Sequence, residues 1–324
     1  NRAVSQIQLA MIRAHNRFCD DLANEYPEGG KELYEAARQR CMWHYQWCVV
    51  HDFLTAICGR PVVEEILAEG RSIYDPKIPF IPVEFSVAAY RFGHSMVPLK
   101  VRLRENAEAF ELFGPEFGHG FSAVANADSV ADMHELFETH FGRPLQPATK
   151  CDAKLAADLL RLSADVDPDE RSLATRNMVR GQSFLLPSGE AVAEELGRPE
   201  EEIEKISKAA RKDEPGLGAG TPLWYYILKE AELIGREEPG TPEKRKGKGR
   251  KRSPAKNTKP GEGLGPVGAT LVAEVIIGLI ELDPRSWLGA NRNWHPETYA
   301  HDAGVEMSTV GNLLAYGSAE APSV

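Results

Sequence analysis

The stretch AAYRFGHSMVP, residues 88–98, places a single histidine inside a short and mostly apolar run. Pro98 cannot continue a helix, so the pattern predicts a short helix that stops there. Arg91 precedes His94 by one helical turn on the same face, and Gly93 adds no side chain beside the ring. A large flat group could therefore approach the imidazole while the arginine binds an anion on that group.

These residues admit two interpretations. Haem has both required features, because its iron accepts a neutral imidazole nitrogen and its propionates pair with arginine. A lone histidine on an apolar helix face is, however, more often a hydrogen-bonded core residue. Taken alone, the stretch favours the core residue, and the rest of the chain has to decide between the two.

The composition is that of an ordinary globular protein. The chain has 324 residues, 42% apolar and 27% charged, which is enough to bury one large core or two smaller ones. The net charge is −10, although residues 241–260 hold nine Lys and Arg against one acidic residue. The rest of the chain is therefore strongly acidic, and nucleic acid is not its expected partner.

A basic run from Lys244 to Arg252 contains no apolar residue. We expect the surrounding residues 236–263 to form a basic, disordered and solvated insertion between two core helices. The alternative is a contact with an anion or a nucleic acid, or a nuclear-type address. This run is the one place where nucleic-acid binding stays open.

Cysteines and apolar runs bear on the compartment. The five cysteines are odd in number and suggest no disulfide framework, which favours a reducing, cytoplasmic environment. The chain opens at Asn1 inside a helical pattern, so we expect its N-terminal part to be missing, and secretion stays open. No apolar run reaches the length of a membrane span, because Glu274 and Glu281 interrupt the longest one.

Apolar residues recur at helical spacing along most of the chain. This spacing predicts helices over residues 2–24, 31–57, 151–162, 188–197, 200–211, 221–235 and 266–282. Residues 99–150, rich in glycine and short polar clusters, look mostly irregular. The fold class is therefore mainly α, a single helical domain over residues 1–324 with long irregular loops and little β structure.

Two cysteines and two histidines share one face of the second predicted helix. They are Cys41, His44, Cys48 and His51. These residue types can ligate zinc. Ligands spread along one straight helix cannot converge on a single ion, so we favour a packed core stripe and keep the metal site as the alternative.

Several short motifs share the order found in one known family. They are IRAHNR at 12–17, YRFGHS at 90–95, RNMVRG at 176–181, LPSG at 186–189, GPVG at 265–268 and WHP at 294–296. In this order the chain resembles the animal-type haem peroxidases, the superfamily of myeloperoxidase, lactoperoxidase and cyclooxygenase, and looks closest to their bacterial branch. The resemblance covers nearly the whole chain and matches the C-terminal part of that domain, roughly two-thirds of it.

The resemblance implies roles for four residues around haem b. His94 corresponds to the proximal iron ligand, and Asn177 to the asparagine that accepts a hydrogen bond from the other ring nitrogen of that histidine. Arg91 and Arg180 correspond to arginines beside the haem. An amide acceptor would fix the tautomer and the ring plane while pulling less on the proton than a carboxylate does.

Two departures from the family pattern refine the prediction. Cyclooxygenases and the related fatty-acid dioxygenases have a radical-forming tyrosine where this chain has Arg91, so peroxidase chemistry is favoured. The family's Arg-x-x-Glu pair, distal histidine and calcium loop would all precede Asn1. We therefore expect no catalytic residue of the distal side in this chain, and any calcium would belong to the missing N-terminal part.

The resemblance implies an oxidoreductase, a haem peroxidase that uses hydrogen peroxide to oxidise a halide, a phenol or another small donor. Hydrogen peroxide and a small electron donor are thus the expected partners, and haem iron on His94 is the expected metal. Two alternatives stay open. One is a non-catalytic haem-binding fragment or degenerate peroxidase, and the other is a helical interaction protein whose basic loop binds an anionic partner.

Overall fold

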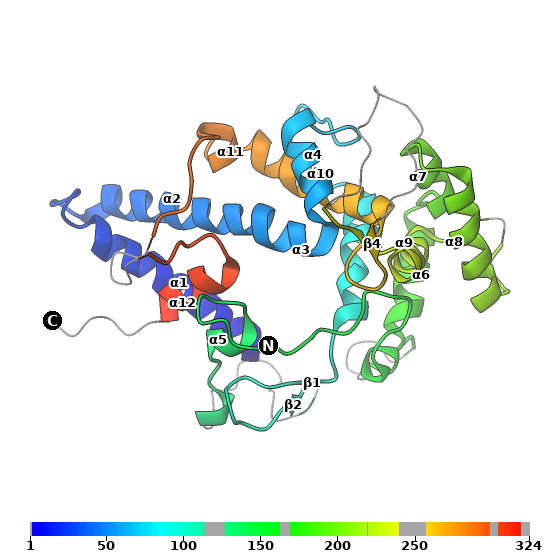
Figure 1. Cartoon of the computed structure of the whole chain (residues 1–324), viewed down its shortest axis with the longest axis horizontal. Coiled ribbons are helices and arrows are strands. Elements are labelled where there is room, and N and C mark those ends of the chain that lie inside the picture. Colours follow the sequence, from blue (N-terminus) through cyan, green and yellow to red (C-terminus); the bar gives the residue numbers. More distant parts are fainter. Residues whose placement is uncertain are drawn as a thin grey trace. The chain divides into compact units, whose positions relative to one another are not determined.

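Helices dominate the computed structural model, which describes residues 2–112, 114, 127–162, 169–218, 220–239, 257–298 and 304–318. Figure 1 shows these helices joined by long irregular stretches. The described strands form two short antiparallel pairs, β1 (Lys100–Val101) with β2 (Phe110–Glu111) and β3 (Arg236–Glu237) with β4 (Thr258–Lys259). The predicted fold class, mainly α with little β structure, is confirmed.

Packing divides the chain into two compact units that alternate along the sequence. Unit 1 holds Asn1–Phe53, Pro98–Pro147 and Asp283–Val324, and unit 2 holds Leu54–Val97 and Ala148–Leu282. Each unit is assembled from separated stretches, so neither is a continuous piece of the chain. The single domain over residues 1–324 that the sequence predicts stays a prediction, since these are units of packing.

Unit 1 contains two long helices and several short ones. Its helices are α1 (Arg2–Leu22), α2 (Gly30–Cys48), α5 (Met133–Leu136), α11 (Trp287–Ala290) and α12 (Val310–Ser318). A π-helical turn, Val49–Leu54, follows α2, and a 3₁₀ turn, Ala127–Ser129, precedes α5. Helix α1 packs against both α2 and α12 (Figure 1). Buried apolar side chains of these three helices form the core of the unit.

The histidine and cysteines of α2 belong to this core. Cys41, His44 and Cys48 are buried. His44 donates from Nδ1 to the Arg40 carbonyl at 2.8 Å and accepts at Nε2 from the Glu297 amide at 3.0 Å. Both ring nitrogens are thus used, and burial lowers the pKa of His44 to about 4. Cys41, His44 and Cys48 therefore lie in the packed core as predicted, whereas His51 is half-buried. Among the described residues, no three His, Cys, Asp or Glu side chains are placed to share a metal ion.

Unit 2 holds the remaining α-helices of the described residues. They are α3 (Thr55–Cys58), α4 (Arg60–Glu69), α6 (Leu173–Ser183), α7 (Gly189–Glu195), α8 (Glu200–Asp213), α9 (Leu223–Leu233) and α10 (Pro266–Leu282). A π-helical turn, Glu84–Ala88, leads into a 3₁₀ helix, Ala89–Met96, and we call these two together the histidine segment. Helices α9 and α10 both pack against this segment.

Helix α10 is the most deeply buried helix of unit 2, and its limits are those that the sequence predicts. Its Glu274 carboxylate is buried and accepts hydrogen bonds from Ser72 N at 2.9 Å, Ser72 Oγ at 2.6 Å, Ile73 N at 2.7 Å and Tyr74 N at 3.0 Å. These backbone N–H groups lie outside any helix, so the carboxylate satisfies donors that have no helical partner. One side chain thereby fixes the course of the chain after α4.

Some predicted helices differ in the structure. The helix predicted over residues 31–57 ends as an α-helix at Cys48, where the π-helical turn begins. The helix predicted over 151–162 is wrong, because only Ala157–Leu160 forms a 3₁₀ turn and the Cys151 amide donates to the Gly261 carbonyl at 2.9 Å. Helix α4 begins with a proline in its first turn and has no counterpart in the prediction. In these places tertiary contacts override local spacing.

The two ends of the basic segment are structured. Strands β3 and β4 pair Arg236 with Lys259 and Glu237 with Thr258. Residues 240–256, with the basic run from Lys244 to Arg252, lie outside the described residues. The disordered insertion there, and any contact of the basic run with an anion or a nucleic acid, therefore stay predictions.

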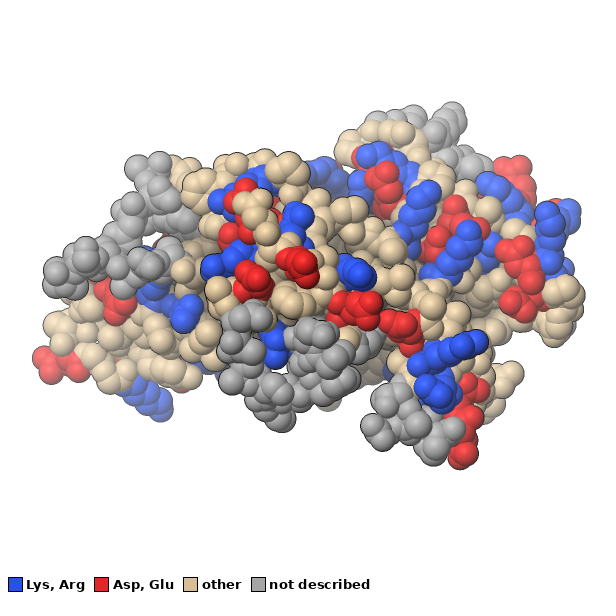
Figure 2. Space-filling model, turned by 90° about the horizontal axis from the view of Figure 1, so that it is seen from below, with Lys and Arg blue, Asp and Glu red and all other residues tan. Residues whose placement is uncertain are grey.

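The cysteines and the surface do not distinguish a cytoplasmic from a secreted location. All five cysteines are free, and all except Cys19 are buried. None of the helices in the described part of the chain combines the length and apolar character needed to cross a bilayer. On the face shown in Figure 2, acidic and basic side chains are interspersed rather than gathered by sign.

The Glu274 contacts give a stability prediction. Glu274→Gln keeps the size of the side chain but turns an NH₂ group toward backbone donors, which leaves buried polar groups unsatisfied. We expect the free energy of unfolding to fall by about 2–3 kcal/mol in urea titrations followed by circular dichroism. Glu201→Gln, at an exposed position in the first turn of α8, is the control. Equal stability of the two variants would contradict this account.

A second buried carboxyl group, that of Glu230 in α9, lies at the N-terminus of α10. It accepts from the Val267 amide at 3.0 Å and from the Gly268 amide at 3.2 Å. Burial raises the pKa of the Glu230 carboxyl to about 8, against the opposing influence of Arg198 and of these N–H groups. Gly265 leaves the necessary space, since a Cβ there would lie 2.3 Å from the Glu230 Cγ.

The raised pKa of Glu230 predicts a pH-dependent stability. Between pH 4.5 and about 8 the folded protein keeps a proton that the unfolded chain releases. The free energy of unfolding should therefore fall as pH rises through this window, by up to about 1.4 kcal/mol per pH unit. Glu230→Gln should remove that part of the slope in urea titrations at several pH values. The same slope in variant and wild type would show that Glu230 is not its source.

Candidate functional site

The histidine segment lies between two prolines, Pro82 and Pro98. Where the sequence predicts one short helix, the structure has a π-helical turn followed by a 3₁₀ helix that ends at Met96. Residues three apart in a 3₁₀ helix are eclipsed, so Arg91 and His94 still lie on one side of the segment. The change of helix type therefore preserves the shared face.

Helix α6 brings Asn177 to this face. Its N-cap is Ser172, whose side chain accepts from the Thr175 amide at 3.3 Å. Asn177 is the buried residue of this helix, with 1% of its surface exposed. Its Nδ2 lies 3.0 Å from His94 Nδ1, and its Oδ1 accepts from Arg91 Nη1 at 3.2 Å. The three side chains thus form one hydrogen-bonded group, although Asn177 is 83 residues from His94 in sequence.

The direction of the bond between Asn177 and His94 differs from the one that the resemblance implies for a haem-bound histidine. The resemblance implies that Asn177 accepts, whereas in the structure Asn177 donates from Nδ2 and His94 accepts at Nδ1. Arg91 is the cause, because a guanidinium has only donors and so takes the amide oxygen. His94 Nδ1 then carries no proton, and the ring proton lies on Nε2.

The charges next to this group are those of two arginines, Arg91 and Arg180. Burial, and then the charge of Arg91, lower the pKa of His94 and favour the neutral imidazole. Burial and the neighbouring charge of Arg180 likewise lower the pKa of Arg91. Within the described residues neither arginine forms an ion pair with a carboxylate. Two neighbouring arginines with no paired carboxylate in the described part of the chain make this place attractive to an anion.

Backbone contacts hold the histidine segment in place. Arg91 Nε donates to the Ser86 carbonyl at 3.0 Å, and Trp224 Nε1 of α9 donates to the Arg91 carbonyl at 3.2 Å. Thr149 Oγ1 donates to the Ser95 carbonyl at 2.7 Å. Neither Trp224 nor Thr149 was predicted from the sequence to have this role. No local signal could have found them, because each is far from the segment in sequence.

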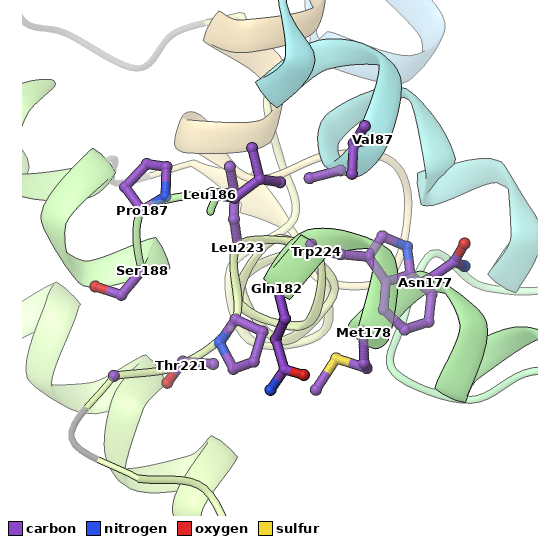
Figure 3. Close-up of a pocket in the computed structure, with 14 residues that line it drawn as sticks. Val87, Asn177, Met178, Gln182, Leu186, Pro187, Ser188, Thr221, Leu223 and Trp224 are labelled. Carbon is purple, nitrogen blue, oxygen red and sulfur yellow. The ribbon is translucent and has the colours of Figure 1, made fainter. Parts of the chain in front are cut away.

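A cavity of about 220 Å³ adjoins Asn177 between α6 and the start of α9. Figure 3 shows Asn177 and Trp224 toward one end of it and Ser188 and Thr221 toward the other. Ser188 caps α7 as predicted, and Gly189 is required because a Cβ there would lie 2.1 Å from the Tyr226 side chain. Cofactor sites usually measure about 300–1,000 Å³, so this cavity borders the site but is too small to hold a porphyrin.

The open side of the site lies at Gly93. A Cβ added at Gly93 would meet no atom within 4 Å. A flat group could therefore lie against the histidine segment there, with the neutral imidazole and the arginines beside it. The four residues predicted from the sequence, Arg91, His94, Asn177 and Arg180, thus belong to one neighbourhood. Their arrangement suits a metal-bearing ligand with anionic substituents.

Residues 1–214 match the family model described as animal haem peroxidase. The matched range includes the histidine segment and α6, and hence all four candidate residues.

Curated relatives agree with that match at low identity. The chain is 26% identical over 240 residues to the dual oxidase of Drosophila melanogaster, covering 71% of this chain and 15% of that protein. It is 28% identical over 167 residues to dual oxidase 1 of Caenorhabditis elegans, covering 49% and 11%. It is 29% identical over 211 residues to the chorion peroxidase of Drosophila melanogaster, covering 61% and 25%. The chain therefore spans a quarter or less of the length of these relatives.

These relatives are animal proteins, so they lend no support to a closer likeness with bacterial members. The family itself rests on the match of the family model, which extends over more than half of the chain. This match, together with the mainly α fold, establishes that the chain belongs to the animal haem peroxidase family.

Proposed function

We propose that this chain carries the proximal, haem-binding side of a peroxidase that uses hydrogen peroxide to oxidise a halide, a phenol or another small donor. The hydrogen-bonded group of His94, Asn177 and Arg91 is the observation that carries this proposal. In it, His94 is the iron ligand, Asn177 orients the imidazole ring, and Arg91 and Arg180 bind the carboxylates of haem b.

The residues present suit such a cofactor. A neutral imidazole is the form that binds iron, and burial favours it at His94. Arg91 and Arg180 form no ion pair within the described residues, so an anionic substituent would supply the missing counter-ion. When bound, haem iron would supply the redox chemistry that links peroxide to the donor.

Iron ligation would require His94 and Asn177 to change together. Ligation through Nε2 needs that nitrogen unprotonated, so the ring proton has to move to Nδ1. Asn177 then has to turn its amide over and present Oδ1 to that proton. This deprives Arg91 of its acceptor and frees the guanidinium for a haem carboxylate. Iron binding and carboxylate binding would thus favour the same orientation of Asn177.

The iron-ligand role predicts the outcome of a haem titration. The purified chain should bind ferric haem and develop the Soret band of a histidine-bound haem. His94→Ala should weaken haem binding by at least about tenfold and change the band, because the iron loses its protein ligand. Added imidazole should restore the histidine-type spectrum in this variant.

His295→Ala removes an exposed histidine in unit 1 and is the matched control. An unchanged Soret band in His94→Ala would overturn the ligand assignment. Peroxide-driven oxidation of a phenolic dye by the haem-loaded chain then separates a peroxidase from the non-catalytic haem-binding alternative. Haem binding without such turnover would support the latter.

The role of Asn177 predicts a change in redox potential. Asn177→Asp can accept from both Arg91 and His94 without turning over, and its carboxylate pulls harder on the Nδ1 proton. We expect the reduction potential of the bound iron to fall by an amount on the order of tens of millivolts. A spectroelectrochemical titration measures it. An unchanged potential would refute the pairing of Asn177 with the ligand histidine.

A further inference from the structure

A larger cavity, of about 600 Å³, lies in unit 2 between the chain after α4, helix α7 and helix α10. Its volume falls within the range of about 300–1,000 Å³ that is usual for small-molecule sites. Most of its wall is apolar and includes three aromatic rings. The apolar residues that carry the argument are Tyr74, Phe80, Phe85, Leu196, Leu271 and Val275.

The wall of this cavity is held in place before any ligand arrives. Glu274 fixes the backbone from Ser72 to Tyr74 through the four hydrogen bonds described above. The Tyr74 hydroxyl donates to the Phe80 carbonyl at 2.6 Å and accepts from the Phe80 amide at 3.2 Å, closing the turn that carries Phe80. Because this wall is already ordered, ligand binding would lose less conformational entropy there. Phe80 is nevertheless 56% exposed, so a ligand could still cover it.

The charged residues that line the cavity are all acidic. They are Asp75, Glu84 and Glu195, and the lining contains no Lys or Arg. None of the three forms an ion pair or a side-chain hydrogen bond within the described part of the chain. Glu84 is half-buried, so its charge is screened by solvent less than that of an exposed carboxylate.

We propose that this cavity binds a hydrophobic organic cation, an aromatic ring system that carries an ammonium group. The apolar walls would take the ring, the acidic residues would attract the ammonium, and the aromatic rings would add cation–π contacts. An anionic analogue is repelled by three carboxylates, and a neutral one gains only apolar contact. The cavity does not contain the haem-site residues, so this proposal holds whether or not the chain binds haem.

Three indoles of similar size and different charge test the proposal. The probes are tryptamine, which is a cation, tryptophol, which is neutral, and indole-3-propionate, which is an anion. Calorimetric titration of the full chain should give one tryptamine site with a dissociation constant on the order of 100 µM. Tryptophol and indole-3-propionate should bind at least about tenfold more weakly, and added salt should weaken tryptamine binding.

Variants locate the site. Glu84→Gln should weaken tryptamine binding by about three- to tenfold and leave tryptophol binding unchanged. Glu201→Gln removes the same charge from an exposed position outside the cavity and should have no effect. Ala191→Phe, at an exposed position on the cavity wall, should fill the space and weaken tryptamine binding by at least about tenfold. Circular dichroism checks that each variant keeps its helices.

Several results would overturn the proposal. Equal affinity for the three indoles would show that the cavity does not select by charge. Equal effects of Glu84→Gln and Glu201→Gln would show that only the overall charge of the protein matters. Tryptamine binding that Ala191→Phe leaves unchanged would place the indole elsewhere, and no tryptamine binding at millimolar concentration would rule the site out.

Discussion

The amide of Asn177 limits what the candidate site can do. It is buried, and its oxygen and nitrogen face two different partners, Arg91 and His94. Arg91 can only donate, whereas the imidazole can donate or accept, so the arginine decides the orientation of the amide and thereby the tautomer of the histidine. Any anion that takes Arg91 away from Asn177 releases this constraint. The residues around His94 therefore control whether its Nε2 carries a proton.

A series of hydrogen bonds connects the histidine segment to helices α9 and α10 in the interior of unit 2. Trp224 of α9 donates to the Arg91 carbonyl, Glu230 of the same helix accepts from the first turn of α10, and Glu274 of α10 accepts from the chain after α4. Both carboxyl groups are fully buried, so each would be costly without its backbone donors. The histidine segment and the wall of the larger cavity therefore depend on the same two helices. Sites carried by rigid elements of this kind keep their geometry better than sites on loops.

The local sequence pattern predicted best those features that depend on residues within one helix. The limits of α10 follow from its apolar run and the Gly265–Pro266 start, and the Ser188 cap follows from residue type. The pairing of His94 with Asn177 came from family resemblance, because no spacing rule links residues so far apart in sequence. Neither the local pattern nor the family resemblance could predict the direction of their hydrogen bond in this structure, because it depends on where the Arg91 guanidinium lies in space. The helix predicted from Cys151 failed for a similar reason, because its amide finds the Gly261 carbonyl.

The histidine segment carries a negative charge at its start and a positive charge near its middle. Glu84, in its first turn, lines the larger cavity, whereas Arg91, near its middle, faces Asn177. Pro187 borders both this cavity and the smaller one beside Asn177, so the two environments are neighbours within unit 2. Carboxylate groups of a cofactor would be drawn to the arginines and repelled by Glu84, and an ammonium group would experience the reverse. Two ligands of opposite charge could therefore occupy adjoining places without competing, because the field of one short segment directs each to its own side.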